Sequence, residues 1–171
     1  GMILTGEEKV MEKIRRLRFY GMEKQYFSME NGINSRLDEL HAAILRVKLR
    51  KLDYYITQRQ KIAARYDEAL KDTPLGLPSK NPYNDHAYYA YVVSHPQRDQ
   101  ILEKLLTHDI RLNVSYRWPI HTMPPFKHFL AENENLAETD KAAAQIFSLP
   151  MYPSLKEEDQ ERVIEVITSI M

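Results

Sequence analysis

The feature that most constrains this chain is one long amphipathic pattern over residues 32–70. Its apolar residues recur at steps of three and four, so most of them fall on one stripe of an α-helix: Leu37, Leu40, Ile44, Val47, Leu52, Tyr55, Ile62, Tyr66 and Leu70. Ser35 and Asp38 fit a capping box, and Asn34 is also a good N-cap one residue earlier. Because Pro74 cannot continue a helix, the pattern predicts one long helix that ends just before it.

The start of this helix also has the chemistry of an anion site. Free N–H groups at a helix N-terminus attract anions. Gly32 allows close approach of the backbone, Asn34 offers an amide, and Arg36 carries a fixed positive charge. These residues fit a phosphate cradle. From the residues alone, however, the favoured interpretation is an ordinary capped helix whose Arg36 forms a salt bridge.

Composition excludes several classes of function. The chain has 171 residues with 24 basic and 24 acidic side chains, which does not suggest a nucleic-acid or membrane partner. There is no cysteine, and the six histidines show no tight ligand spacing, so we predict no disulfide and no metal site. No apolar run approaches the length of a membrane span. We expect a cytoplasmic protein.

The sequence around the long helix predicts two different kinds of segment. Ahead of it we expect a strand end, a helix and an apolar loop, at 2–5, 6–19 and 20–31. The loop either covers its own core or reaches a partner subunit. After the helix we expect strand, helix, strand, helix, extended segment and helix, at 86–95, 97–108, 110–116, 133–146, 147–151 and from about 155 onward. The second series predicts a small α+β domain, with a small sheet and helices on one face, whereas the first is typical of the tail of a larger α/β domain.

Several motifs in one order along the chain resemble a known family. They are Gly-x-Asn-x-Arg-Leu-Asp-Glu-Leu at 32–40, Tyr-x-x-Pro-x-His at 116–121 and Leu-Pro-Met-Tyr-Pro-Ser-Leu at 149–155. Together they resemble the C-terminal half of the DegT/DnrJ/EryC1/StrS aminotransferases, the enzymes dependent on pyridoxal phosphate (PLP) that aminate nucleotide-linked keto-sugars. The residues at 34–40, together with Tyr-Gly at 20–21, are most similar to those of the branch that makes 3-amino sugars on dTDP carriers.

The resemblance implies the C-terminal small domain of a fold-type I PLP transferase. It divides the chain into a remnant of the large domain with an active-site loop, a long linking helix and a small α+β domain, at 1–35, 36–73 and 74–171. It also implies a homodimer.

The resemblance further implies which residues meet the cofactor and the substrate. Asn34 would contact the phosphate of PLP in the other subunit. Arg36 would support the same loop or bind substrate. Tyr116 and His121 would lie near the substrate entrance, and a strand-end tyrosine and a loop histidine with local hydrogen bonds are equally good interpretations.

The resemblance places the lysine that holds PLP upstream of this chain. Lys9, Lys13 and Lys24 come after that position and are expected to be surface residues. We therefore expect a truncated enzyme with no catalytic residue of its own, which neither binds PLP nor transaminates alone. A separately encoded N-terminal half is one candidate partner. The alternative is a non-catalytic interaction module that oligomerises or pairs with a complete homologue.

Overall fold

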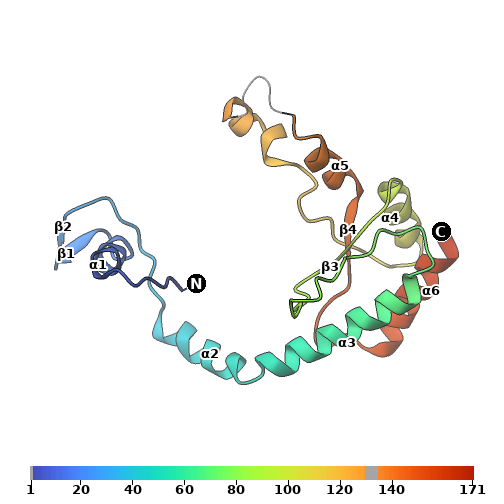
Figure 1. Cartoon of the computed structure of the whole chain (residues 1–171), viewed down its shortest axis with the longest axis horizontal. Helices are drawn as coiled ribbons and strands as arrows, with labels where there is room; N and C mark the ends of the chain where they lie inside the picture. Colours follow the sequence, from blue (N-terminus) through green and yellow to red (C-terminus); the bar gives the residue numbers. More distant parts are fainter. Residues whose placement is uncertain (1, 130–134) are drawn as a thin grey trace. The chain divides into compact units, whose positions relative to one another are not determined.

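The structure, a computed structural model, describes residues 2–129 and 135–171, and its contacts divide the chain into two compact units at 1–51 and 52–171. Figure 1 shows the order of the elements. The first unit contains α1 (Glu8–Leu17), β1 (Met22–Lys24), β2 (Phe27–Ser28) and α2 (Glu39–Leu49). The second contains α3 (Leu52–Leu70), β3 (Tyr91–Ser94), α4 (Arg98–Thr107), the 3₁₀ helices η1 (Ile120–Thr122) and η2 (Pro124–Phe129), α5 (Ala137–Gln145), β4 (Ile146–Leu149) and α6 (Glu157–Ile170). The unit boundary lies inside the helix predicted over 36–73.

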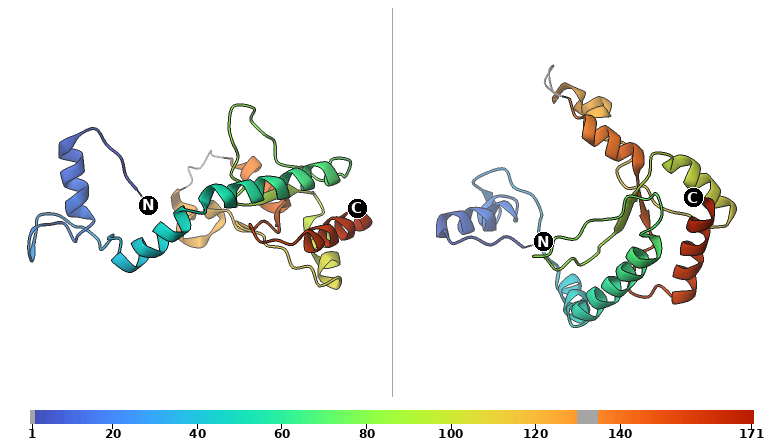
Figure 2. Two further views of the ribbon diagram at one scale, coloured as in Figure 1. Left: turned by 90° about the horizontal axis from the view of Figure 1, so that it is seen from below. Right: turned by 45° about the vertical axis from the view of Figure 1, so that its right-hand side comes forward.

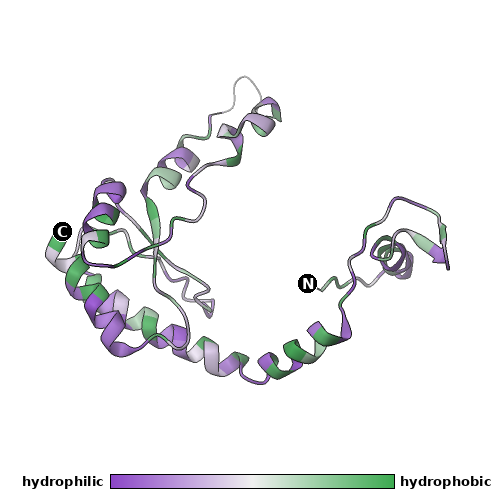
Figure 3. Cartoon of the chain, turned by 180° about the vertical axis from the view of Figure 1, so that it is seen from behind, coloured by the Kyte–Doolittle hydropathy of each residue, from purple (hydrophilic) through white to green (hydrophobic). Residues whose placement is uncertain are grey.

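The prediction of one continuous helix is wrong at Arg50 and Lys51. The Lys51 N–H donates to the Lys48 carbonyl at 3.0 Å, a tight turn that ends α2. None of the residues of α2 is buried. Its large apolar side chains are exposed. The green segments of α2 in Figure 3 mark these hydrophobic residues. A helix this short gains most of its stability from tertiary packing, so nothing within its own unit enforces continuity.

The predicted caps of this helix are also wrong. The N-cap of α2 is Asp38, and its side chain makes no capping hydrogen bond. The Ser35 N–H donates instead to the Arg18 carbonyl at 2.9 Å, and the Asn34 side chain accepts from Arg36. Both residues therefore belong to a loop that is held by α1.

Two further differences concern short strands in the first unit. Residues 2–5 form no strand, because a strand needs a neighbour that shares its backbone hydrogen bonds. The segment 20–31, predicted as a loop, contains a small antiparallel hairpin of β1 and β2. With only five residues in its strands and an irregular register, this hairpin leaves no alternating pattern to detect.

A two-stranded antiparallel sheet lies at the centre of the second unit. Tyr91 of β3 pairs with Leu149 of β4, and Val93 pairs with Phe147. These four residues are buried, whereas Val92 between them is exposed, so one face of the sheet carries the core. The segment predicted as a strand at 110–116 joins by a single bridge, between Asn113 and Ser148.

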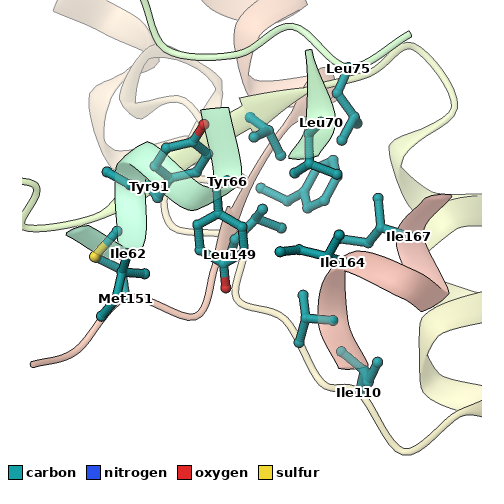
Figure 4. Packing of buried hydrophobic residues seen from close by; sticks show 14 of the residues in the cluster. Ile62, Tyr66, Leu70, Leu75, Tyr91, Ile110, Leu149, Met151, Ile164 and Ile167 are labelled. Carbon is teal, nitrogen blue, oxygen red and sulfur yellow. The ribbon is translucent and has the colours of Figure 1, made fainter. Parts of the chain in front are cut away.

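Helices complete the core on this face. Tyr66 and Leu70 of α3, Leu105 of α4 and Ile167 of α6 are completely buried. Figure 4 shows residues of α3 and α6 converging on the strands, and α6 lies beside α3 in the left view of Figure 2. Helices and small sheets together agree with the predicted α+β class. Among the described residues, no helix has the length and apolar character that a bilayer crossing requires.

Buried tyrosines should make the second unit sensitive to alkaline pH. Burial raises the pKa of the Tyr66 phenol, and burial with a hydrogen bond to Asp67 raises the pKa of Tyr91. A raised folded-state pKa favours the neutral form, so this stabilisation is complete below the unfolded pKa of about 10 and is lost as the pH rises above it. We expect the free energy of unfolding to fall by up to about 1.4 kcal/mol per pH unit for each such tyrosine.

Urea unfolding between pH 8 and 11, followed by circular dichroism, measures this slope. Tyr66→Phe is the matched variant, because it removes one titrating phenol and keeps the ring. It should be less stable than the parent at pH 8 and lose less stability per pH unit above pH 10. Equal slopes for parent and variant would contradict the prediction.

Candidate functional site

The first group of predicted site residues lies in the loop 32–36, against the end of α1. The Ile33 N–H donates to the Leu17 carbonyl at 2.9 Å, and the Tyr20 N–H donates to the Ile33 carbonyl at 3.1 Å. With the contact between Ser35 and Arg18, these bonds fix the loop backbone from both sides. The position of Asn34 and Arg36 is therefore determined by α1 and the residues directly after it.

Two glycines allow this close approach. A Cβ atom on Gly32 would lie 2.1 Å from the Gly21 nitrogen and 2.6 Å from the Leu17 carbonyl oxygen. Gly21 has φ +69°, and a Cβ there would lie 1.7 Å from the Glu30 carbonyl oxygen. All three obstacles are backbone atoms, so no change of side-chain rotamer can make room. The Tyr-Gly and Gly-x-Asn-x-Arg motifs are thus two sides of one contact.

Replacing Gly32 with alanine is expected to displace the loop that carries Asn34. Overpacking against backbone costs about 3 kcal/mol, and the amides of Tyr20 and Ile33 should exchange with deuterium much faster. Hydrogen exchange followed by mass spectrometry over 16–36 measures the effect. Gly6→Ala is the control, because nothing lies within 4 Å of a Cβ at Gly6. Exchange of Gly32→Ala that matched this control would show that the contact does not hold the loop.

Arg36 and Asn34 are in direct contact. The Arg36 Nε donates to the Asn34 Oδ1 at 3.1 Å, and the guanidinium carbon of Arg36 lies 5.0 Å from the centre of the Phe19 ring. In the part of the chain that the structure describes, Arg36 contacts these two residues and no carboxylate. The salt bridge favoured from the residues alone is therefore not seen.

A cavity beside this contact has the donors that an anion requires. Its volume is about 320 Å³, and it is lined by Arg15, Arg18, Phe19 and Arg36. Three guanidinium groups around one opening favour a ligand with several negatively charged oxygens. We call this the arginine cavity. The residue pattern missed Arg15 and Arg18, although the basic run at 15–18 ends fourteen residues before Gly32.

The second group of predicted residues shares another cavity, within the second unit. Tyr116 and His121 line a space of about 470 Å³ together with a set of apolar residues and one threonine, namely Trp118, Pro119, Ile120, Phe126, Phe129, Leu136 and Thr139. We call this the aromatic cavity. Its residues come from the segment 116–129 and from the start of α5. The structure thus brings together the two residues that were predicted near a substrate entrance.

The local surroundings of these two residues differ. The His121 Nε2 lies 2.9 Å from the Asp140 Oδ1 on α5, and the His121 side chain is 15 % exposed. Tyr116 has φ +60° and is 84 % exposed. The contact with Asp140 could not be predicted from sequence, because nineteen residues separate the partners. Among the described residues there is no cluster of three metal-binding side chains.

The chain belongs to the DegT/DnrJ/EryC1/StrS aminotransferase family, whose sequence pattern matches residues 1–168. This confirms the resemblance inferred from the motifs. Pyridoxal phosphate is the cofactor of this family. The predicted likeness to the dTDP branch is confirmed as well: the chain is 45 % identical, over its whole length, to a dTDP-3-amino-3,4,6-trideoxy-alpha-D-glucose transaminase from Micromonospora megalomicea subsp. nigra, and covers 47 % of that protein.

Solved structures agree with this assignment. Streptomyces venezuelae DesV, in complex with a ketimine intermediate, is similar with a TM-score of 0.90 and 32 % identity, over 98 % of this chain and 45 % of DesV. Bacillus subtilis NtdA with bound PMP cofactor has a TM-score of 0.86 and 25 % identity, over 97 % of this chain and 40 % of NtdA. The chain spans about half the length of the curated relatives that it matches.

Proposed function

We propose that this chain is the C-terminal part of a PLP-dependent nucleotide-sugar aminotransferase, which moves an amino group from glutamate or glutamine to a keto-sugar. The observation that carries the proposal is the family match over residues 1–168, with the Gly-x-Asn-x-Arg motif folded into one loop. The identity with a dTDP-sugar transaminase supports a nucleotide-linked sugar as substrate. We also propose that the whole enzyme is a homodimer and acts in the cytoplasm.

In this proposal the loop 32–36 binds the phosphate of PLP. When bound, PLP supplies the electron sink that weakens the bonds at the carbon bearing the amino group. The residues present suit its phosphate. The Asn34 Oδ1 accepts from Arg36, which leaves the Nδ2 of Asn34 as a donor, and the guanidinium groups of the arginine cavity balance the negative charge.

The aromatic cavity would form part of the substrate wall. Its aromatic residues offer flat apolar faces, and its polar groups are the His121 imidazole and the hydroxyl groups of Tyr116 and Thr139. Because Asp140 occupies the Nε2 of His121, the Nδ1 remains for a ligand. Asp140 thereby sets the orientation of the ring before any ligand arrives.

We further propose that residues 1–171 do not transaminate or bind PLP stably by themselves. The lysine that holds PLP would lie in the part of the relatives that this stretch does not match. The three lysines near its start support this, since Lys9, Lys13 and Lys24 are all exposed. A separately supplied N-terminal half would then be required for activity.

The second candidate function is a non-catalytic interaction module. The observation that favours it is the exposed apolar stripe of α2, where Leu40 is 72 % and Val47 is 60 % exposed. Such a surface tends to be covered by a partner. This module would oligomerise or pair with a complete homologue.

A fusion protein distinguishes the two functions. The upstream half of the Micromonospora relative is joined to residues 1–171, and amino transfer from glutamate to that relative's dTDP-linked keto-sugar is measured. The enzyme proposal expects transfer by the fusion and none by either half alone, with the intact relative as control. A folded fusion that binds PLP but transfers no amino group would contradict it. Association of the separate halves without transfer would favour the interaction module.

A further inference from the structure

Arg98, the first residue of α4, is a buried arginine that contacts the end of another helix. It is 4 % exposed. Its Nη1 donates to the Ala143 carbonyl at 2.5 Å and to the Ile146 carbonyl at 3.3 Å. The Ala143 carbonyl lies in the last turn of α5, where the carbonyl groups lack helical partners and carry the negative end of the helix dipole, and Ile146 is the extended residue that follows α5 and begins β4. A cation at this place is therefore favourable, and its loss would leave these carbonyls unpaired.

The other end of α5 forms one wall of the aromatic cavity. Leu136, its N-cap, and Thr139 line the cavity, and Asp140 contacts His121. Ala143 is the one buried residue among the nine of α5, all of which the structure describes. Since apolar packing holds so little of this helix, polar contacts such as those of Arg98 with Ala143 and of His121 with Asp140 help to fix its position.

Arg98 also reaches the opposite wall through Asp99. Its Nε donates to the Asp99 Oδ1 at 3.0 Å, and the same carboxylate oxygen lies 3.4 Å from Nη2 of Arg117. Arg117 stands between Tyr116 and Trp118, which both line the cavity. The hydrogen bond from Arg98 lowers the pKa of Asp99, so the carboxylate is charged at neutral pH.

We propose that Arg98 is a positioning residue for the aromatic cavity. It holds the α5 wall directly, through Ala143 and Ile146, and the 116–118 wall indirectly, through Asp99 and Arg117. The aromatic cavity therefore keeps its shape through hydrogen bonds and ion pairs of a residue that does not line it. That Arg98 thereby affects substrate binding rests on the proposed function. That it holds the two walls of the cavity does not.

Hydrogen exchange of the chain 1–171 tests the two links separately. Arg98→Lys keeps the charge, but its single nitrogen cannot take the places of both Nε, which meets Asp99, and Nη1, which meets the two carbonyls. It should speed exchange about tenfold in both 137–145 and 116–123. Asp99→Asn removes the negative charge that faces both Arg98 and Arg117 but leaves the contacts of Arg98 with the Ala143 and Ile146 carbonyls. Because the side chain of Asp99 is exposed, this variant should speed exchange only about two- to fivefold, and in 116–123 alone. Glu103→Gln, another exposed acid on α4, is the control and should change neither segment.

Two results would overturn the proposal. One is exchange in 116–123 that is the same for Asp99→Asn and Glu103→Gln. The other is an Arg98→Lys protein in which exchange in α3 and α6 rises, relative to the parent, by the same factor as exchange in α5. Such a result would show a general loss of stability. Should Arg98→Lys not fold, Asp99→Asn decides alone, since Asp99 is exposed and its replacement leaves the core intact.

The role in substrate binding has a separate readout. In the active fusion, Asp99→Asn and Arg98→Lys should raise KM for the nucleotide sugar about two- to tenfold and change kcat less than twofold, because a distorted wall weakens binding without touching the reacting atoms. A two- to tenfold fall of kcat with unchanged KM would contradict this role. A fusion without any activity would count against the proposed function, whereas the exchange pattern would still test the contacts of Arg98.

Discussion

Replacing Tyr66 with alanine is expected to lower the free energy of unfolding of the second unit by about 3–5 kcal/mol. Tyr66 of α3 is fully buried, and its ring centre lies 5.0 Å from that of Tyr91. Its hydroxyl donates to the Pro150 carbonyl at 3.1 Å. The substitution therefore creates a large cavity between α3 and the sheet and leaves a half-buried carbonyl without its donor.

Urea unfolding at pH 7 measures this loss. Tyr66→Phe should cost only about 1 kcal/mol, because it removes one hydrogen bond and keeps the ring. Tyr54→Ala is the matched control, since Tyr54 lies on the same helix and is 60 % exposed. A Tyr66→Ala protein within 1 kcal/mol of this control would mean that α3 does not complete the core as described.

Replacing Asn34 or Arg36 with alanine is expected to weaken PLP binding by the active fusion about 10- to 100-fold. Each residue would donate to a doubly charged phosphate, and hydrogen bonds to charged groups contribute about 1.5–3 kcal/mol each. Asn34→Ala also removes the acceptor that orients Arg36, so the effects of the two substitutions should be less than additive. Fluorescence titration of the apoenzyme with PLP gives the two dissociation constants.

Two controls isolate the phosphate contact. Arg46→Ala removes an exposed arginine from α2 in the same unit and should leave PLP affinity unchanged. Pyridoxal, which lacks the phosphate, should bind parent and variants alike. If Arg36→Ala raised KM for the nucleotide sugar and left PLP affinity intact, Arg36 would bind substrate instead. Unchanged PLP affinity in both variants would remove the loop from the cofactor site.

A helix could be predicted correctly from the sequence where its apolar residues are buried within its own unit. The apolar stripe at Ile62, Tyr66 and Leu70 predicted an α3 that is buried as expected. The same stripe continues at Leu40 and Val47, where no residues of the first unit bury it. There the helix ends at Leu49 and does not continue as predicted. Periodicity shows which side chains seek burial, but it does not show what covers them.

The segment 110–116 illustrates a second limit. Its alternation predicted the burial of Ile110, but not that only Asn113 would pair with the sheet. Alternation indicates which face of a strand turns inward. The length of a ladder depends on the neighbouring strand, and β4 has only four residues.

For the candidate sites, local motifs were informative and long-range contacts were not. Gly32, Asn34 and Arg36 stand within five positions, and their contact follows from the motif itself. Arg98 meets a carbonyl forty-five residues away, and no sequence signal identifies a carbonyl as a partner. The contacts that link Arg98 and Asp99 to the aromatic cavity were therefore found only from the structure.

The most direct test of this account is a PLP titration followed by borohydride, which fixes PLP to the lysine that holds it, with the labelled lysines mapped by mass spectrometry. The chain 1–171 and the fusion are treated side by side. The account predicts one stoichiometrically labelled lysine in the fusion, within the half from the relative, and weak, scattered labelling of the chain alone. Saturable labelling of a single lysine in the chain alone, such as Lys9, Lys13 or Lys24, would contradict it, because the chain would then build its own cofactor site.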